Sequence, residues 1–213
     1  MKISLAFIAT FLVSSVASSL LNDTLAAAPC TNPNLDDITF KIERERHKSR
    51  PRGVRKLKLA RTFSRDLYFQ VRFRSDARYT TATPSNQYDW NKLLGFTTNR
   101  IHKNSLRLGW RWNPTRAKFD LGFYGYRDSV RTMPELTSVD ADTWVDVHIH
   151  FSDTRMAITA DGVTHEETGA MGVDWGPIST WLMRTAYFGG DEKSPQTMHI
   201  DVRGITVDRD CAR

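Results

Sequence analysis

Polar residues of two kinds recur along this chain: some can bind an anionic group, and others can move a proton. Those that could act as acid or base are Tyr124, His148 and His102. Those that could bind and orient a substrate are Gln70, Arg72, Asn104, Arg107, Arg111 and Tyr126. Arginine and amide groups donate hydrogen bonds to a carboxylate, whereas tyrosine and histidine take up or release protons. The set predicts a site that binds an anionic ligand, or one that removes a proton next to a bound carboxylate.

Each candidate also has a purely structural interpretation. The two tyrosines could be cross-strand neighbours rather than a platform on which sugar rings stack. The arginines within 105–112 could form ion pairs across a sheet with Asp120 or Asp146. His148 could be an ordinary surface residue of a strand, whereas His102 falls in a loop-like stretch with few packing demands. The sequence leaves these alternatives open.

Hydrolysis of a glycosidic bond is less well supported. A glycosidase needs two carboxyl groups on either side of the scissile bond. The carboxylates expected on the outward faces of strands are Asp120, Asp146 and Asp201, and none of them is paired with another at i, i+2 spacing. A hydrolase is therefore the weaker enzymatic option.

The sequence predicts no cofactor and supports metal binding only weakly. His148 and His150 point the same way on a predicted strand, but no third zinc ligand follows at a suitable spacing. Asp191 beside a glycine could hold a structural calcium ion through loop oxygens. The competing interpretation is that this aspartate bonds the backbone of its own turn.

The candidate residues lie in short segments in which apolar and polar residues alternate with a period of two. Leu67, Phe69, Val71 and Phe73 alternate with polar residues, a pattern typical of a half-buried strand. Trp110 and Trp112 share the apolar face of their segment and are expected in the core. The same pattern predicts strands at 105–112, 119–126, 145–151, 156–160, 163–167, 198–203 and 205–207, with a long loop at 76–88.

Turn signals join these segments into antiparallel pairs. Asn113-Pro114 and Asp161-Gly162 each separate two neighbouring strand segments. A helical period is hard to find after the N-terminal segment, so no helices are expected to cover a parallel sheet. The sequence therefore predicts an all-β protein: an antiparallel β-sandwich of the jelly-roll type in a single domain, residues 29–213, with its first and last strands side by side.

The first 28 residues look like a secretory signal peptide, with a cleavage site somewhere between 17 and 28. Lys2 precedes an apolar run from Ile3 to Val16 that is too short to span a membrane. A secreted protein, extracellular or periplasmic, with no membrane span is therefore expected. Cys30 and Cys211 are the two cysteines of the chain, and an even number in an exported protein favours a disulfide bond between them.

The formal net charge is +6, which favours a negatively charged partner. Much of the excess lies between Lys41 and Arg65. This stretch could bind a ligand, or it could be a solvated basic edge that discourages sheet aggregation. Nucleic acid is not expected, because no nucleic-acid-binding motif accompanies the charge and the chain is predicted to be exported.

Two segments resemble a known superfamily. Tyr187-Phe188-Gly189-Gly190-Asp191, followed by the strand at 198–202, resembles the closing strands of concanavalin A-like lectins and glucanases and a turn of secreted bacterial polysaccharide lyases. The blocks at 91–96 and 102–112 are similar to the central sheet of the same proteins. The chain departs from them in lacking a Glu-x-Asp-x-x-Glu glucanase motif and the Arg-x-Glu-x-Arg and Gln-x-His motifs of one alginate lyase family.

The resemblance implies a polysaccharide partner, and the charge favours an acidic one. The leading hypothesis is a secreted, monomeric carbohydrate-binding module. The alternatives are a polysaccharide lyase that cleaves a uronic-acid-containing chain by β-elimination in the same groove, and a secreted structural or adhesive protein. The fold alone does not separate them, because this superfold hosts binding proteins, hydrolases and lyases.

Overall fold

The computed structural model describes residues 37–52, 59–62, 65–98, 100–172 and 180–207. One set of strands is β1 (Ile38–Ile42), β2 (Arg50–Arg52), β4 (Asp66–Phe73), β10 (Val145–Phe151), β11 (Arg155–Ala160), β12 (Val163–Thr168) and β14 (Met198–Val207). The other set is β3 (Leu59–Thr62), β5 (Asn91–Thr97), β6 (Ser105–Asn113), β7 (Lys118–Arg127), β8 (Val130–Thr132), β9 (Glu135–Val139) and β13 (Thr180–Met183). Short 3-10 turns η1 (Ser75–Ala77) and η2 (Pro84–Asn86) lie in the predicted long loop.

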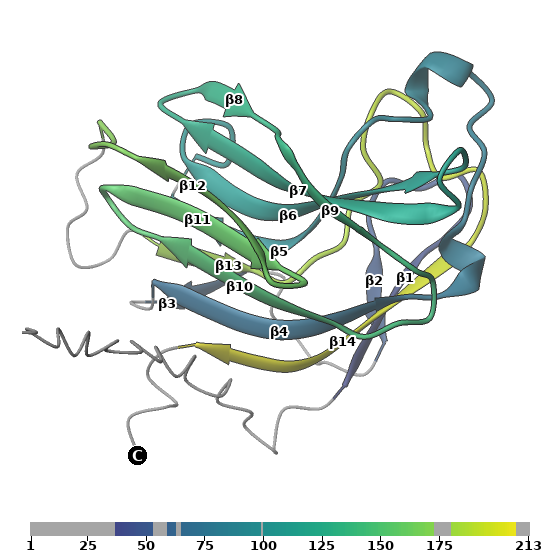
Figure 1. Ribbon diagram of the computed structural model, residues 1–213, viewed down its shortest axis with the longest axis horizontal. Helices are drawn as coiled ribbons and strands as arrows, with labels where there is room; N and C mark the ends of the chain where they lie inside the picture. Colours follow the sequence, from purple (N-terminus) through teal and green to yellow (C-terminus); the bar gives the residue numbers. More distant parts are fainter. Residues whose placement is uncertain (1–36, 53–58, 63–64, 99, 173–179, 208–213) are drawn as a thin grey trace, which may run out of the picture.

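These strands form two sheets that lie against each other as curved layers (Figure 1). The first sheet has the order β12-β11-β10-β4-β14-β1-β2. The second sheet has the order β3-β13-β5-β6-β7-β8, and β9 also pairs with β7. The strand pairs are antiparallel, and β1 lies beside β14 as expected for the first and last strands. The predicted all-β sandwich is confirmed.

The core forms because the alternating apolar residues of both sheets face each other. Along β4 buried and half-buried residues alternate, as predicted from the sequence. Phe73 of this strand contacts the second sheet, with ring centroids 5.2 Å from Trp110 and 4.9 Å from Phe119. Trp110 and Trp112 are both buried, so their predicted place in the core is confirmed.

Two hairpins confirm the turn signals. β6 and β7 pair from Ser105 opposite Tyr126 to Asn113 opposite Lys118. β11 and β12 are joined through Asp161 and Gly162, whose φ angles of 50° and 76° match the two-residue hairpin turn that requires positive φ at both positions. The β6–β7 hairpin carries several of the candidate residues on its outer face.

Other predictions concern residues outside the described ranges. The signal peptide at 1–28 and the disulfide bond between Cys30 and Cys211 both belong to this group. Within the described ranges, no helix combines the length and apolar character that crossing a membrane requires.

Candidate functional site

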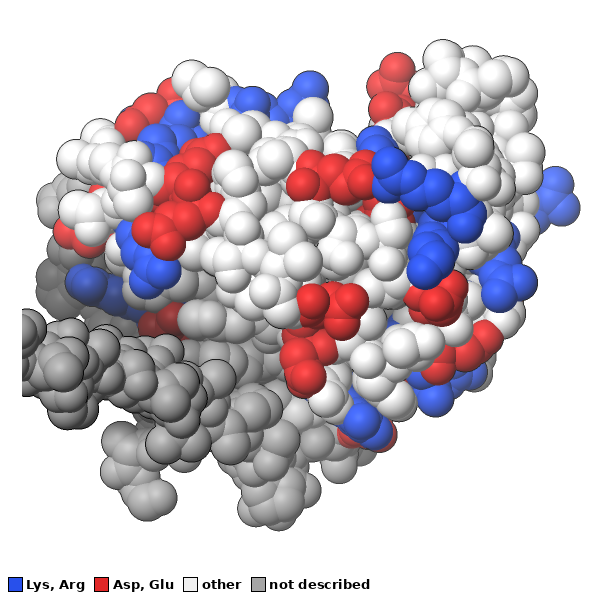
Figure 2. Space-filling view, viewed as in Figure 1, with Lys and Arg blue, Asp and Glu red and all other residues white. Residues whose placement is uncertain are grey.

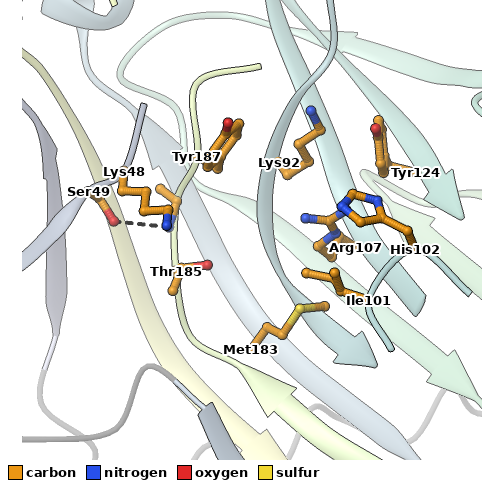
Figure 3. Close-up of a pocket in the computed structure, with 11 residues that line it drawn as sticks. Lys48, Ser49, Lys92, Ile101, His102, Arg107, Tyr124, Met183, Thr185 and Tyr187 are labelled. Carbon is orange, nitrogen blue, oxygen red and sulfur yellow. Dashed lines mark hydrogen bonds between the residues drawn. The ribbon is translucent and has the colours of Figure 1, made fainter. Parts of the chain in front are cut away.

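A pocket of about 500 Å³ opens on the outer face of the second sheet (Figure 3). Arg107 on β6 stands directly opposite Tyr124 on β7, and both side chains line the pocket. The connection between β5 and β6 contributes His102, and the chain from Met183 to Tyr187 contributes the opposite side. The full lining is Lys48, Ser49, Lys92, Ile101, His102, Arg107, Tyr124, Met183, Thr185, Ala186 and Tyr187.

Lys92 on β5 lies between two aromatic rings of the pocket. Its Nζ atom is 4.8 Å from the centre of the Tyr124 ring and 5.2 Å from that of Tyr187, and Figure 3 shows the lysine between them. Burial, and then the positive charges of Arg107 and Arg131, lower the pKa of Lys92 to about 8. The charge of this lysine therefore changes at mildly alkaline pH.

Arg107 is a buried cation. It is 9% exposed, and its guanidinium carbon lies 5.0 Å from the centre of the Tyr124 ring. Its Nε atom is buried and has no hydrogen-bond partner among the described residues. Burial lowers the pKa of Arg107, but an arginine remains charged at any physiological pH. Because a buried charge is unfavourable without a counter-charge, an anionic ligand would complete this site.

Tyr124 and Tyr126 continue the polar face along β7. Their ring centres lie 5.9 Å apart, and His102 meets Tyr126 edge-on at 5.3 Å. Burial, and then the hydrogen bond with Tyr126, raise the pKa of Tyr124. Arg131 on β8 lies within hydrogen-bonding reach of Tyr124. The structure thus brings together four of the residues singled out in the sequence, which are His102, Arg107, Tyr124 and Tyr126.

Asn104, another candidate, holds the turn that carries His102. Its backbone carbonyl accepts a hydrogen bond from the Thr98 amide at 3.0 Å. Its side-chain Oδ1 accepts one from the Asp128 amide at 2.8 Å, and Lys103 accepts another from the Ser129 amide at 2.9 Å. Asn104 is fully buried and does not line the pocket. In this structure its contacts position the β5–β6 connection against the β7–β8 turn.

Arg111 lies on the same face of β6 as Arg107, but in different surroundings. Its Nε donates to the buried carboxylate of Asp120 at 3.1 Å, and its Nη2 donates to Glu135 at 2.8 Å. Arg116 joins the same two carboxylates. The sequence alternative of an ion pair across the sheet therefore applies to Arg111 with Asp120, and not to Arg107.

The ring of Trp90 lies on the outer face of the β6–β7 hairpin, between the surroundings of Arg107 and those of Arg111. Gly109 and Gly122 stand opposite each other on β6 and β7, and the Trp90 ring lies over both of them. A Cβ atom at Gly122 would come within 2.6 Å of this ring, and one at Gly109 within 3.1 Å. The guanidinium carbon of Arg111 lies 4.2 Å from the Trp90 ring centre. The two glycines are needed here because the tryptophan lies directly on the backbone.

Gln70 and Arg72 lie on β4 of the first sheet, and therefore not at the pocket. Gln70 donates a hydrogen bond to Asp146 at 2.7 Å and accepts one from Arg203 at 2.6 Å. Arg72 forms an ion pair with Asp201 at 2.8 Å. These polar groups satisfy one another across neighbouring strands.

His148 also lies on the first sheet. Its ring stacks on Tyr68 with centres 4.3 Å apart, and its Nε2 is 2.7 Å from the carboxylate of Asp66. His150 reaches the same carboxylate at 2.8 Å. Burial favours the neutral form of Asp66, but the hydrogen bonds from the two histidines outweigh it and hold the pKa of Asp66 well below its usual range. His148 therefore shares no site with Tyr124 or His102.

Several cations elsewhere on the surface form ion pairs with carboxylates, among them Lys41, Arg50 and Lys118. Figure 2 shows basic and acidic side chains beside one another over one side of the molecule. Arg155 and Glu166 on the β11–β12 hairpin pair at 2.7 Å, as an example. The pocket differs because several cations line it together and no aspartate or glutamate is found among its described lining residues.

The sequence did not single out Lys92, Arg131 or Tyr187 as site residues, and it included Lys48 only as part of the basic stretch 41–65. The pairing of β5 with β6 shifts register between Lys92 and Gly95, and Leu93 and Leu94 are both buried. Simple alternation therefore fails in β5 just where the lysine lies. Sequence reasoning could have found Lys92 through one signal: it is a lysine inside a segment expected to belong to a sheet, and lysine is depleted in strands.

The described residues hold no group of three or more histidine, cysteine, aspartate or glutamate side chains that could bind a metal ion. Asp191, the candidate for a calcium ligand, lies exposed after Gly190. Gly190 itself has a φ of 70°, as a turn requires. The geometry of this loop is accounted for by the turn.

No family model matches this chain, and no curated protein matches it. Solved structures do resemble it. An alginate lyase from Klebsiella pneumoniae has a TM-score of 0.51 at 11% identity, covering 67% of this chain and 58% of that enzyme. The alginate lyase AlyC3 has a TM-score of 0.51 at 11% identity, covering 79% of this chain and 73% of that enzyme.

These neighbours are concanavalin A-like jelly-roll proteins, so the resemblance noted in the sequence is confirmed at the level of the fold. This chain spans little more than half the length of the Klebsiella enzyme.

Proposed function

We propose that this protein binds an acidic polysaccharide in the pocket on the second sheet. One observation carries the proposal: the described lining residues include Lys48, Lys92, His102 and Arg107 but no aspartate or glutamate. The anionic groups of the ligand supply the missing counter-charges. Arginine suits a carboxylate, because its planar guanidinium can donate two parallel hydrogen bonds.

The tyrosines account for the carbohydrate part of the proposal. Tyr124 and Tyr187 lie on either side of Lys92, and Tyr126 lies beside Tyr124. Aromatic rings of this kind offer flat surfaces to sugar rings. The fold adds support, because the neighbours described above are named for their action on alginate, a polyuronate. At 11% identity this support concerns the scaffold and not the residues.

A second candidate function is cleavage of the bound chain by β-elimination. It is favoured by the place of Tyr124, whose ring lies beside both Lys92 and Arg107. In such a reaction a base removes the proton at C5, the C4–O bond breaks, and the departing oxygen takes up a proton as the C4–C5 double bond forms. Arg107 would stabilise the charge that develops on the carboxylate, and Tyr124 or His102 would transfer the proton.

A panel of polysaccharides separates these functions. Alginate, polygalacturonate, hyaluronate and a neutral β-glucan are titrated against the protein at low and at physiological ionic strength. We expect an acidic chain to bind, and its affinity to fall as salt rises, because screening weakens charge pairing. Equal affinity for the neutral glucan, without salt dependence, would contradict the proposal.

Growth of ultraviolet absorbance from unsaturated ends in the same samples identifies a lyase. Arg107→Gln is expected to weaken binding by about thirtyfold, and Arg155→Gln on the first sheet serves as the matched control, because Arg155 pairs with Glu166 on the β11–β12 hairpin and does not line the pocket. If absorbance grows, Tyr124→Phe should stop it while binding persists. Binding without any increase in absorbance leaves the binding module as the function.

A further inference from the structure

Two cations that line the pocket, Arg107 and Lys92, differ in whether they can lose their charge. Arg107 carries a permanent charge, because guanidinium does not lose its proton in proteins. Lys92 is an amine that can lose its proton, and it is largely shielded from solvent between Tyr124 and Tyr187. The backbone also crowds it, since a Cβ atom on Gly189 would lie 3.0 Å from its Nζ.

The charged groups around Lys92 mostly oppose its protonated form. Arg107 on β6 and Arg131 on β8 repel it, and Asp89, just before β5, attracts it more weakly. Lys48 and His102 line the same pocket and add no negative charge. The neighbouring hydroxyl groups belong to Tyr124 and Tyr187. An incoming carboxylate would therefore be the strongest favourable partner for a protonated Lys92.

We propose that Lys92 couples ligand binding to proton uptake: at alkaline pH, where Lys92 is neutral, the pocket takes up one proton at Lys92 when the anionic group of the polysaccharide enters beside Arg107. The inference rests on the proposed function and adds the regulation of that site. The ligand binds tightly while Lys92 is charged, and Arg107 alone holds it less tightly once Lys92 is neutral.

The direction of the pH dependence follows from linkage. The pKa of Lys92 is about 8 in the empty pocket, and a bound carboxylate raises it. A ligand that raises a pKa binds more tightly to the protonated form, so affinity falls as pH rises through 8 and levels off above the pKa of the complex. From pH 7 to pH 9 the affinity is expected to fall about tenfold, because each pH unit above the lower pKa removes about one factor of ten.

Calorimetry with the tightest-binding acidic chain of the panel tests this. Titrations at pH 7 and pH 9, each in two buffers of different ionisation enthalpy, give the affinity and the number of protons taken up. At pH 9 we expect about one proton per binding event and at pH 7 close to none. If unsaturated ends form, the titrations are carried out in the Tyr124→Phe background.

Three variants separate the possible causes. Lys92→Arg should bind with little change between pH 7 and pH 9 and without proton uptake, whereas Lys92→Met should bind weakly at both values. His102→Gln keeps Lys92 and should retain the wild-type pH dependence. Thermal melting of each variant checks that it is folded.

The outcomes distinguish the two proposals. If no acidic chain binds at pH 7, the proposed function is wrong and this inference with it. If an acidic chain binds but proton uptake at pH 9 is absent, or persists in Lys92→Arg, the inference is wrong and the binding function stands. If His102→Gln removes the dependence, the coupling belongs to the histidine and not to Lys92.

Discussion

Two arginines on one strand face show how the same residue serves different purposes. Arg107 and Arg111 lie four positions apart on β6 and point to the same side of the second sheet. Arg111 is held by Asp120 and Glu135, and its neighbour Arg116 binds the same pair of carboxylates. Arg107 faces Tyr124 and has no acidic residue among the described lining of its pocket.

The difference comes from the residue opposite each arginine. Asp120 stands across from Arg111 on β7, whereas Tyr124 stands across from Arg107. An arginine paired with buried carboxylates contributes to the fold, since removing either partner leaves a buried charge. An arginine buried against aromatic rings without a counter-charge weakens the fold slightly, and under the proposed function a ligand supplies its partner. Such sites, where stability is given up, often serve function.

The largest expected effect is at the paired arginine. Arg111→Met leaves Asp120, which is 0% exposed, with Arg116 as its remaining cation. We expect the free energy of unfolding to fall by about 3 kcal/mol, measured by urea denaturation. Adding Asp120→Asn to this variant should recover part of the loss, because the buried charge is removed. A loss below about 0.5 kcal/mol, typical of a surface substitution, would show that the network adds little.

The same substitution at the unpaired arginine should act on binding instead. Arg107→Met removes a buried cation without leaving a carboxylate unpaired, so the free energy of unfolding should stay the same or rise by about 1 kcal/mol. Binding of an acidic polysaccharide should weaken by about 2 kcal/mol, close to thirtyfold. Denaturation and calorimetry on one preparation measure both quantities. Clear destabilisation of this variant would remove the contrast with Arg111.

Lys92 sharpens the comparison through the pH dependence of stability. Its pKa of about 8 in the folded protein lies below the ordinary lysine value of 10.5, so the unfolded chain holds more protons between these two values. Stability from this group therefore rises with pH across that window. Lys92→Met should be more stable than the wild type at pH 7, by about 1 kcal/mol, and this advantage should shrink towards pH 10. An advantage that does not change with pH would contradict the assigned cause.

The smallest effect is expected on the first sheet. His148 is held by Asp66 and Tyr68, away from the pocket in the fold. His148→Ala should leave polysaccharide affinity unchanged and lower the free energy of unfolding by about 1 kcal/mol or less. Affinity measurements on His148→Ala beside His102→Ala make the comparison direct. Lost affinity in His148→Ala would place the ligand on the first sheet instead.

The strands could be predicted from the sequence because alternation is a local property. In β4 and in the β6–β7 hairpin each side chain that faces the core is apolar, and burial requires that pattern. Asp161-Gly162 predicted its hairpin because few residues tolerate the positive φ angles of that turn. The pairing of β1 with β14 followed from the expected jelly roll, not from either strand alone.

The sequence also identified part of the pocket. Arg107 and Tyr124 were assigned to outward faces of neighbouring strands, and the hairpin register brings them opposite each other. Gln70, Arg72 and His148 have the same alternating pattern, yet they lie on the other sheet. Alternation states that a side chain points outward, but it does not state on which of two sheets, because both sheets have one outward face.

Tertiary structure alone decided which cations remain unpaired. Whether a cation is neutralised depends on the residue across the sheet and on chain segments distant in sequence. Glu135 pairs with Arg111, whereas Tyr187 places an aromatic ring beside Lys92. The sequence by itself determined an all-β chain whose outward faces carry arginine, tyrosine and histidine. Packing decided that one group of them would surround a pocket without carboxylates, because charge pairing depends on distance in space and not on separation along the chain.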